Sequence, residues 1–473
     1  MKHISRRDFM KGTMAAGLAT FIPARVFGAN DDIRIAIAGI HGRGSSHIQA
    51  FDKMKGVRVV ALCDVDRNVL DQRAAPFEKK SQKVDKYLDI RKLLENKDID
   101  AISCATPNHW HSLITFWACQ AGKDVYVEKP LSHNVYEGRK IVEAARKYKR
   151  IVQHGTQSRA DKTRAKQVAL ARSGNYGKLL IAKGYCCKPR WTIGFKPITT
   201  PPEYVDFNLW LGPAPQQPFH ANLVHYNWHW FWDFGNGDLG NQGVHQMDLS
   251  RWGTGHTLPN TVVSLGGRWV NEPYFKDQAQ TPNQIVSIYD YGDCLLLFET
   301  RGLVHKKDYE YPRIVGVEFY CEDGLIKEDA FYPNGKNKPE KLAKIDFDMK
   351  PGSIFENFIY AVRSRKYQDL QADVLQGHYS SALCHLGNIS YRLGSRTKFE
   401  KPKDLGNNKI VGDSIMTMLA NTQAIGVDPE KAALQVGPKL TFDPETERFL
   451  DNPAADQLLT RPYRRPFVVT DKV

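Results

Sequence analysis

Short apolar runs alternate with amphipathic segments along the first third of the chain. The runs at 33–38, 57–63, 101–105 and 125–127 are bounded by glycine or polar residues, a pattern that predicts buried strands. Segments with apolar residues at helical spacing separate these runs, and one more helix and strand follow up to residue 157. Strands and helices that alternate at such short spacing predict a doubly wound, Rossmann-type parallel sheet.

The pattern changes after residue 157. Loops rich in proline and tryptophan run to Trp232, and strand patterns then dominate from residue 262 to about residue 331. Helical segments such as "GHYSSALCHLGNISYRLG" follow, and the last residues are rich in loops. We therefore expect a C-terminal α+β domain with a large, mostly antiparallel open sheet.

The N-terminus has the features of an export signal. Arg6 and Arg7 lie in a basic start, an apolar stretch covers 12–23, and small residues follow near Gly28. The segment "SRRDFMK" closely resembles a twin-arginine signal, which carries folded proteins, often with cofactor bound. We expect a periplasmic or otherwise exported protein that uses the twin-arginine machinery; whether the signal is cleaved or kept as an anchor stays open.

Charge and cysteine content narrow the function classes. The net charge is +14, but no basic run is interleaved with aromatic residues, so we expect a generally basic surface and no nucleic-acid partner. No long uncharged apolar run follows the leader, so we expect no stable membrane insertion after cleavage. The eight cysteines form no CxxC pair and no regular framework, so we expect no structural disulfide and no metal site.

A glycine-rich turn follows the first strand. An anion-binding turn of this kind needs small residues, so that the backbone approaches a pyrophosphate at the start of a helix. Asp64 ends the next strand, about 20 residues on, where a carboxylate binds a ribose hydroxyl and repels a 2′-phosphate. We therefore favour NAD as cofactor, and Arg67 leaves NADP open. The candidate cofactor residues here are Gly39, His41, Gly42, Arg43, Gly44 and Asp64, with His41 where the second glycine of G-x-G-x-x-G usually stands.

Two further loops leave the carboxyl ends of predicted parallel strands, where ligands of open α/β sheets bind. The loop "ATPNH" offers the cofactor contacts Thr106, Pro107, Asn108 and His109, although an ordinary β-to-α turn explains these residues equally well. The stretch "DVYVEKPLSHN" ends a strand with Glu128 and Lys129. In the crevice, Lys129 would act as an acid or base if its pKa were lowered, and Glu128 would orient ribose or the lysine. A solvated ion pair is the alternative.

These segments, together with "GDLGNQGVHQMD", make the chain resemble the Gfo/Idh/MocA oxidoreductases. The resemblance implies a two-domain NAD(P)-dependent enzyme that acts on sugars or cyclitols, with Lys129 and His245 as catalytic residues. It places Asn241 where relatives often have aspartate, and an asparagine cannot accept a proton at neutral pH. Further candidates for substrate contacts are Asp248, Gln157, Arg159, Trp228 and His229, followed by Asp233, Arg190 and Trp191. The same resemblance allows a homo-oligomer that forms through the open face of the second-domain sheet.

Export adds a constraint, because a soluble cofactor pool cannot be assumed outside the cytoplasm. The expected function is oxidation of a sugar, glycoside or cyclitol hydroxyl by a tightly bound cofactor that is recycled in place. A redox-neutral glycosidase that oxidises, eliminates and reduces again is the alternative, and a non-catalytic sugar-binding protein is the third. The expected divisions are an export signal at 1–29, an NAD(P)-binding domain at 30–157, a substrate and oligomerisation domain at 158–400, and a loop-rich extension at 401–473.

Overall fold

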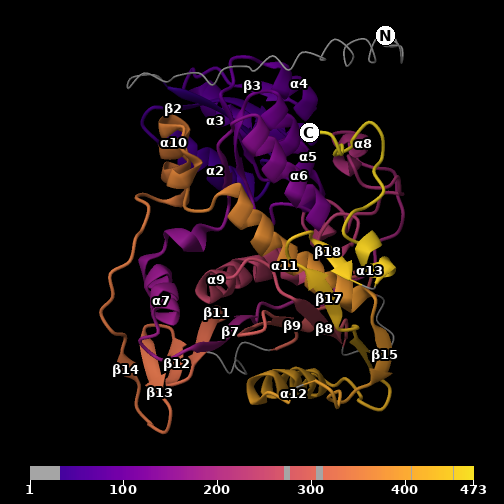
Figure 1. Cartoon of the computed structure of the whole chain (residues 1–473). Helices are drawn as coiled ribbons and strands as arrows, with labels where there is room; N and C mark the ends of the chain where they lie inside the picture. The colour runs from indigo at the N-terminus through magenta and orange to yellow at the C-terminus, as the bar shows by residue number, and fades with distance from the viewer. Residues whose placement is uncertain (1–31, 271–276, 305–312, 406, 451) are drawn as a thin grey trace.

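The computed structural model describes residues 32–270, 277–304, 313–405, 407–450 and 452–473 (Figure 1). The predicted export signal at 1–29 lies outside the described residues. The described chain forms two sheets, each with its own helices, joined by the long helix α11.

The first sheet is parallel and has the strand order β3-β2-β1-β4-β5-β6, the arrangement of a Rossmann fold. Its central strands are almost fully buried, with Arg34 of β1 the exception, because helices cover both faces, and this explains their mainly apolar sequence. The fold class is confirmed, and the bounds of β1 and β2 are those the sequence predicted. The strands are β1 Ile33–Ala38, β2 Val57–Cys63, β3 Asp85–Tyr87, β4 Ala101–Cys104, β5 Asp124–Val127 and β6 Val152–His154.

The two helical layers of this sheet come from different parts of the chain. α2 (Arg43–Asp52), α3 (Arg67–Lys79) and α10 (Ile354–Ser364) pack on one face, although α10 lies far downstream in the sequence. α4 (Ile90–Glu95), α5 (Asn108–Gln120) and α6 (Val135–Lys147) contribute to the core on the other face. The Rossmann domain is therefore completed by a helix from the segment 158–400.

The second sheet has twelve strands among the described residues, with β7 and β10 as its parallel pair. Its main path runs β14-β13-β12-β11-β7-β10-β9-β8-β16-β15, and β17 and β18 pair at its side. The strands are β7 Leu179–Cys186, β8 Thr261–Gly267, β9 Gln284–Asp290, β10 Leu295–Arg301, β11 Val315–Cys321, β12 Gly324–Lys327, β13 Ala330–Pro333, β14 Glu340–Lys341, β15 Ser395–Lys398, β16 Ala433–Val436, β17 Leu440–Asp443 and β18 Arg448–Leu450.

Helices lie on both faces of this sheet too. α7 (Lys162–Ser173), α9 (Val244–Thr254) and α11 (Val374–Arg392) lie on the side facing the Rossmann domain (Figure 1). α12 (Lys409–Ala424) buries Ile415 and Met418 against the opposite side. The face expected to be open for oligomerisation is thus partly covered by the chain's own helix, and homo-oligomerisation stays a prediction.

The segment after residue 401 contains more regular structure than its composition indicates: α12, β16 to β18 and α13 (Pro453–Gln457). Its last part returns to the Rossmann domain. Phe467 packs edge-on against Trp110, with 5.4 Å between ring centroids. Tyr463 donates a hydrogen bond to Glu137, 3.0 Å away. Residues 458–473, the C-terminal strap, therefore tie α5 and α6 to the second domain.

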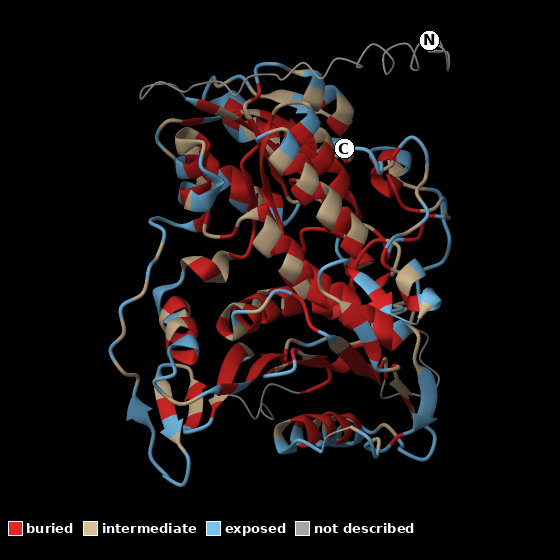
Figure 2. Cartoon of the chain, viewed as in Figure 1, coloured by how far each residue is buried: buried red, intermediate tan, exposed pale blue. Residues whose placement is uncertain are grey.

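Buried residues concentrate in the two sheets and in α11 between them (Figure 2). All eight cysteines are buried free thiols. Within the described ranges, no helix is both long and apolar enough to cross a membrane.

Candidate functional site

A cavity of about 440 Å³ opens at the carboxyl ends of the parallel strands. One wall is the turn after β1, the end of β2 and the loop after β4, and the opposite wall comes from the second domain. The predicted site residues that line it are Gly39, His41, Gly42, Arg43, Asp64, Thr106, Pro107, Asn108, Glu128, Lys129, Trp228, His229 and Asn241. The cavity thus brings together most of the predicted cofactor residues and three of the predicted substrate contacts.

The glycines of the first turn are required for different steric reasons. Gly39 has φ +76°, and a Cβ there would lie 2.5 Å from the Thr106 nitrogen. A Cβ on Gly44 would lie 1.9 Å from the Gly39 oxygen, so Gly44 permits close packing under the turn. Gly42 faces the cavity with no atom within 4 Å of the position of its Cβ. Because α2 begins at Arg43 without a side-chain cap, no side chain competes with an anion for its first amides.

Asp64 holds the turn as well as lining the cavity. Its carboxylate accepts from the Ile40 amide at 2.8 Å and from the Asp66 amide at 3.1 Å. Burial raises its pKa, and these two hydrogen bonds oppose the change. Arg67, which left NADP open, donates to the main-chain oxygen of Glu203.

The loop after β4 divides its side chains between the cavity and the core. Asn108 is 3% exposed, and its Oδ1 has no hydrogen-bond partner among the described residues. His109 points away from the cavity: its Nε2 donates to the Trp210 carbonyl at 2.9 Å, and burial lowers its pKa to about 3. Asn108 is therefore placed to contact a ligand, whereas His109 packs between domains.

Glu128 is the centre of a buried polar cluster. Its Oε1 accepts from Arg43 at 2.8 Å and from Gln157 at 3.0 Å, and it lies 3.1 Å from Nε2 of His47. Although burial alone would raise its pKa, the contacts with His47 and Arg43 hold it well below the usual value. Gln157, predicted to bind substrate, is instead held by Glu128 and Tyr126.

Lys129 places its ammonium in the cavity. Its Nζ donates to the main-chain carbonyl of Asn241 at 2.6 Å, across the two domains. Burial lowers the pKa of Lys129, although the negative charge of Glu128 opposes this change. Asn241 lies in the π-helical turn Leu239–Gly243, an irregularity common at functional sites.

His245 is the second residue of α9, directly after that turn. It is not among the described residues that line the cavity. Its Nδ1 has no hydrogen-bond partner in the described structure, and burial, followed by the positive charge of Lys129, lowers its pKa to about 3. His245 is therefore a neutral imidazole that lies close enough to Lys129 for the lysine charge to lower its pKa.

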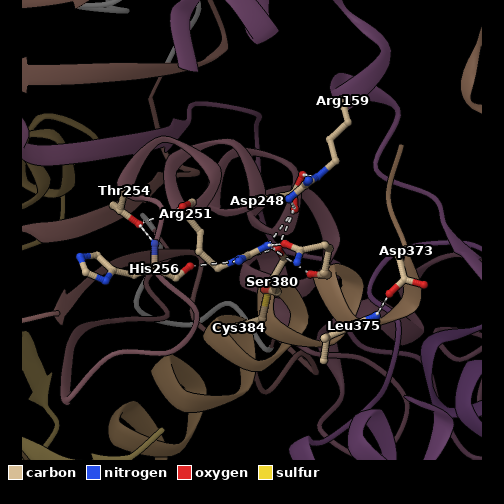
Figure 3. Close-up of polar contacts among 10 residues, drawn as sticks. Arg159, Asp248, Arg251, Thr254, His256, Asp373, Leu375, Ser380 and Cys384 are labelled. Atoms are coloured by element: carbon tan, nitrogen blue, oxygen red, sulfur yellow. Dashed lines mark hydrogen bonds and ion pairs between the residues drawn. The ribbon is translucent and has the colours of Figure 1, made fainter. Parts of the chain in front are cut away.

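Asp248 and Arg159, both predicted to bind substrate, bind each other (Figure 3). Arg159 donates from Nε and Nη2 to the two carboxylate oxygens at 2.8 and 2.9 Å. Ser380 of α11 donates to the same carboxylate at 2.6 Å. Neither residue lines the cavity among the described residues, and the pair joins the 157–160 turn, α9 and α11 behind it.

The aromatic segment 225–234 forms the second-domain wall. His229 stacks on Trp228 at a centroid distance of 3.6 Å, and its Nδ1 donates to the Tyr226 carbonyl. Burial lowers the pKa of His229 to about 3. Asp233 accepts from Gln217 and Arg190 is ion-paired with Asp238, so both of these weaker candidates are held by protein partners.

Other site residues were missed from sequence. His41 stacks on His225 at 4.1 Å, and Nε2 of His225 lies 3.1 Å from Asp66. His111 lies between the carbonyl oxygens of Thr106 and Pro130, at 2.8 and 2.7 Å, and so joins the two loops. These contacts link residues far apart in sequence, so no local sequence pattern predicts them.

A three-donor group lies elsewhere: His256, Asp293 and Cys294 gather beside the β9–β10 turn. His256 and Asp293 are hydrogen-bonded at 2.9 Å, and burial raises the pKa of the Cys294 thiol to about 12. Asp293 is exposed and His256 partly so, and exposed acidic groups of this kind are common without a bound ion.

The first cavity fits a dinucleotide. Gly42 leaves room beside the uncapped α2 terminus for a pyrophosphate, Asp64 stands at the ribose position, and Asn108 has an acceptor free for a polar ligand group.

Known proteins support this assignment. One model of an oxidoreductase family with an NAD-binding Rossmann fold matches residues 33–156, and a model of that family's C-terminal α/β domain matches residues 178–423. A glycosyl hydrolase family 109 protein of Shewanella putrefaciens and an alpha-N-acetylgalactosaminidase of Shewanella oneidensis are each 27% identical over 219 residues. These matches cover 40% of this chain and 48% of each relative, so the chain spans about half the length of these curated relatives.

Solved structures share the fold. The WlbA dehydrogenase of Bordetella pertussis, in complex with NADH and UDP-GlcNAcA, is 18% identical with a TM-score of 0.51, covering 76% of this chain and 95% of its own. A levoglucosan dehydrogenase in complex with NADH and L-sorbose is 16% identical with a TM-score of 0.53, covering 76% of this chain and 97% of its own.

Proposed function

Because this chain belongs to the Gfo/Idh/MocA oxidoreductase family and binds NAD in its Rossmann domain, we propose that it oxidises a hydroxyl of a sugar, glycoside or cyclitol. The observation that carries the proposal is the position of Lys129. Its half-buried ammonium is anchored across the domain interface and lines the same cavity as the glycine turn.

The role of Lys129 follows from its contacts. The Asn241 carbonyl takes one of its three N–H bonds and so orients the amine, and burial lowers its pKa. A lysine with a lowered pKa is more often neutral and accepts the hydroxyl proton, while bound NAD supplies the hydride acceptor. Glu128 stays ionised and holds Arg43 and Gln157 in place around the lysine.

His245 has a secondary role in this proposal, because it lies behind the cavity wall next to Lys129. With a pKa near 3 it remains neutral at working pH and leaves proton transfer to Lys129. Trp228 supplies an aromatic wall on which the C–H face of a sugar ring can stack.

We further propose that the protein is exported with its cofactor bound and recycles it in place. The arginine pair and apolar stretch at the N-terminus support this step. Two half-reactions then occur before release: one hydroxyl is oxidised and a second carbonyl compound is reduced.

A redox-neutral glycosidase is the second candidate, and the names of the curated relatives favour it. Oxidation of a glycoside at carbon 3 acidifies the proton on carbon 2. Lys129 would remove that proton, the anomeric substituent would leave, water would add, and reduction would restore the hydroxyl. The net reaction is hydrolysis, with no net change in NAD.

The test begins with protein purified after export. It is denatured, and any released nucleotide is identified by mass. Stoichiometric NAD(H) is expected; a site that is empty and also fails to bind added NAD would overturn both candidates in favour of a sugar-binding protein. Turnover of free sugars with an added carbonyl acceptor then supports the oxidoreductase, whereas release of aglycone from aryl glycosides without net NADH supports the glycosidase.

A further inference from the structure

A second cavity, of about 400 Å³, lies between α11, the turn after Lys129 and the C-terminal strap. Four segments distant in sequence build most of it: the 133–134 turn, residues 232–236, the end of α11 from His385 to Arg392, and residues 457–462 from the end of α13. It shares no lining residue with the first cavity. The two cavities are therefore separate, although both take lining residues from the 225–241 segment.

Two buried amide oxygens in this cavity have no partner within the described structure. Asn388, 4% exposed, donates from Nδ2 to the Asn236 carbonyl at 2.8 Å, and this fixes its amide with Oδ1 unpartnered. Asn236, 6% exposed, donates from Nδ2 to the His133 carbonyl at 3.0 Å, which leaves its Oδ1 unpartnered as well. Both residues line the cavity, so its wall contains two fixed hydrogen-bond acceptors without a protein partner.

Two donors accompany these acceptors. Arg461 donates from Nη1 to Nδ1 of His133 at 3.0 Å, and since a guanidinium can only donate, the proton of neutral His133 must be on Nε2. His133 Nε2 and Arg461 Nη2 are both buried atoms without a partner in the described residues. An unsatisfied buried polar atom costs about 1–3 kcal/mol, so four together indicate a ligand or ordered water.

The arrangement favours a molecule with several hydroxyl groups. Each hydroxyl both donates and accepts, which matches alternating amide oxygens and N–H groups. Trp232 lines the same cavity, and the guanidinium of Arg392 lies 5.1 Å from its ring centroid, so an aromatic surface is fixed beside the polar atoms. The volume suits a ligand of monosaccharide size.

We propose that this second cavity is a binding site for a monosaccharide or a similarly sized polyol, separate from the NAD cavity. Its ligand contacts are Asn236 and Asn388 as acceptors, Arg461 and His133 as donors, and Trp232 as the aromatic wall. The site does not depend on the activity proposed above, because none of these residues lines the NAD cavity.

The test measures sugar binding without turnover. Full-length protein with its cofactor is titrated with glucose, galactose, N-acetylgalactosamine and glucuronate by calorimetry, and each sugar is assayed for a rise in melting temperature. At least one is expected to bind and raise the melting temperature by about 2–4 °C at saturating concentration. Failure of all four at tens of millimolar would overturn the proposal and leave ordered water as the content of the cavity.

Variants show whether the sugar binds in the second cavity or in the NAD cavity. Arg461→Met and Asn388→Leu are each expected to weaken binding at least tenfold, because each removes one fixed contact. Arg465→Met is the matched control, since Arg465 is exposed on the same strap and does not line the cavity. Lys129→Ala is expected to leave this binding unchanged. Binding that is lost in Lys129→Ala but kept in Arg461→Met and Asn388→Leu would assign the sugar to the first cavity and contradict the proposal.

Discussion

The ammonium of Lys129 is held by the main chain of Asn241, at 2.6 Å from its carbonyl oxygen, and not by the Asn241 side chain. The family's second-domain motif therefore positions the lysine through the shape of the π-helical turn. The side chain at position 241 is free to vary in charge, and that freedom allows a direct test of how charge controls the lysine.

Asn241→Asp adds a carboxylate beside Lys129, so the pKa of the lysine should rise. The pH profile of kcat/KM should shift to higher pH by roughly 1 unit, whereas Asn241→Ala should keep the midpoint and change mainly KM. The measurement is a pH–rate profile for both variants. An unchanged profile in Asn241→Asp would remove Lys129 from the rate-limiting proton transfer.

Lys129→Met should abolish turnover, by at least ~100-fold, because it removes the proton acceptor while keeping an unbranched side chain. NAD affinity should change little, since the glycine turn and Asp64 remain. Lys188→Met is the matched control. Lys188 bonds to Gln242, and its positive charge lowers the pKa of Lys129, so this variant should stay active with a profile shifted to higher pH.

Asp64→Ala should weaken NAD binding by about 10- to 100-fold and reduce the preference for NAD over NADP. Its loss removes a ribose partner and frees the amides of Ile40 and Asp66. Dissociation constants for both cofactors provide the measurement, with Asp64→Asn as the size-matched variant. Equal loss of NAD and NADP binding would indicate that Asp64 only supports the turn.

Asp248→Ala should destabilise the fold by about 3–5 kcal/mol, because it leaves the buried Arg159 guanidinium without its partner. The double variant Arg159→Met/Asp248→Leu should lose less, since only the buried Arg251, 3.9 Å from Asp248, is then left without that carboxylate. Urea unfolding at pH 7 measures both. If Asp248 instead contacts substrate, as its sequence position predicted, Asp248→Asn will raise KM while the free energy of unfolding stays unchanged.

Acid should destabilise the protein through its buried histidines. Their pKa values are lowered by burial, so the folded state binds fewer protons than the unfolded state, and stability falls as the pH drops below about 6.5. Each such histidine lowers the free energy of unfolding by roughly 1.4 kcal/mol per pH unit, from its unfolded pKa down to its folded pKa. The pKa is about 3 for His109, His229, His245 and His385 and about 4 for His154.

Denaturant unfolding at pH 7.5, 6.0 and 5.0 provides the measurement. His154→Phe is the informative variant, because neither ring nitrogen of His154 has a partner in the described structure. It should retain stability at pH 7.5 and show a shallower decline toward pH 5.0. An equal decline in this variant would indicate that other groups control acid stability.

Local patterns predicted the elements whose burial is decided within a few residues. The continuous apolar runs of β1 and β2 identified both strands because a parallel sheet covered on both faces requires them. Gly39 and Gly44 were predictable for the same local reason, since the turn between β1 and α2 leaves no space for a side chain.

Long-range pairing was not predictable. Arg159 and Asp248 look like pocket residues in the sequence, and only the packing of α9 and α11 shows that they neutralise each other. The addition of α10 to the Rossmann domain and the stacking of His41 on His225 depend on the same tertiary arrangement. A polar residue in a motif therefore indicates a role, but its partner decides which one.

The strap that packs Phe467 on Trp110 has a consequence for biosynthesis. Trp110 lines the NAD cavity, yet the ring that covers its outer side is synthesised more than 350 residues later. The Rossmann domain leaves the ribosome early, but this wall stays uncovered until residue 467 has emerged. We therefore expect this wall of the NAD cavity to gain its full packing only after translation has ended.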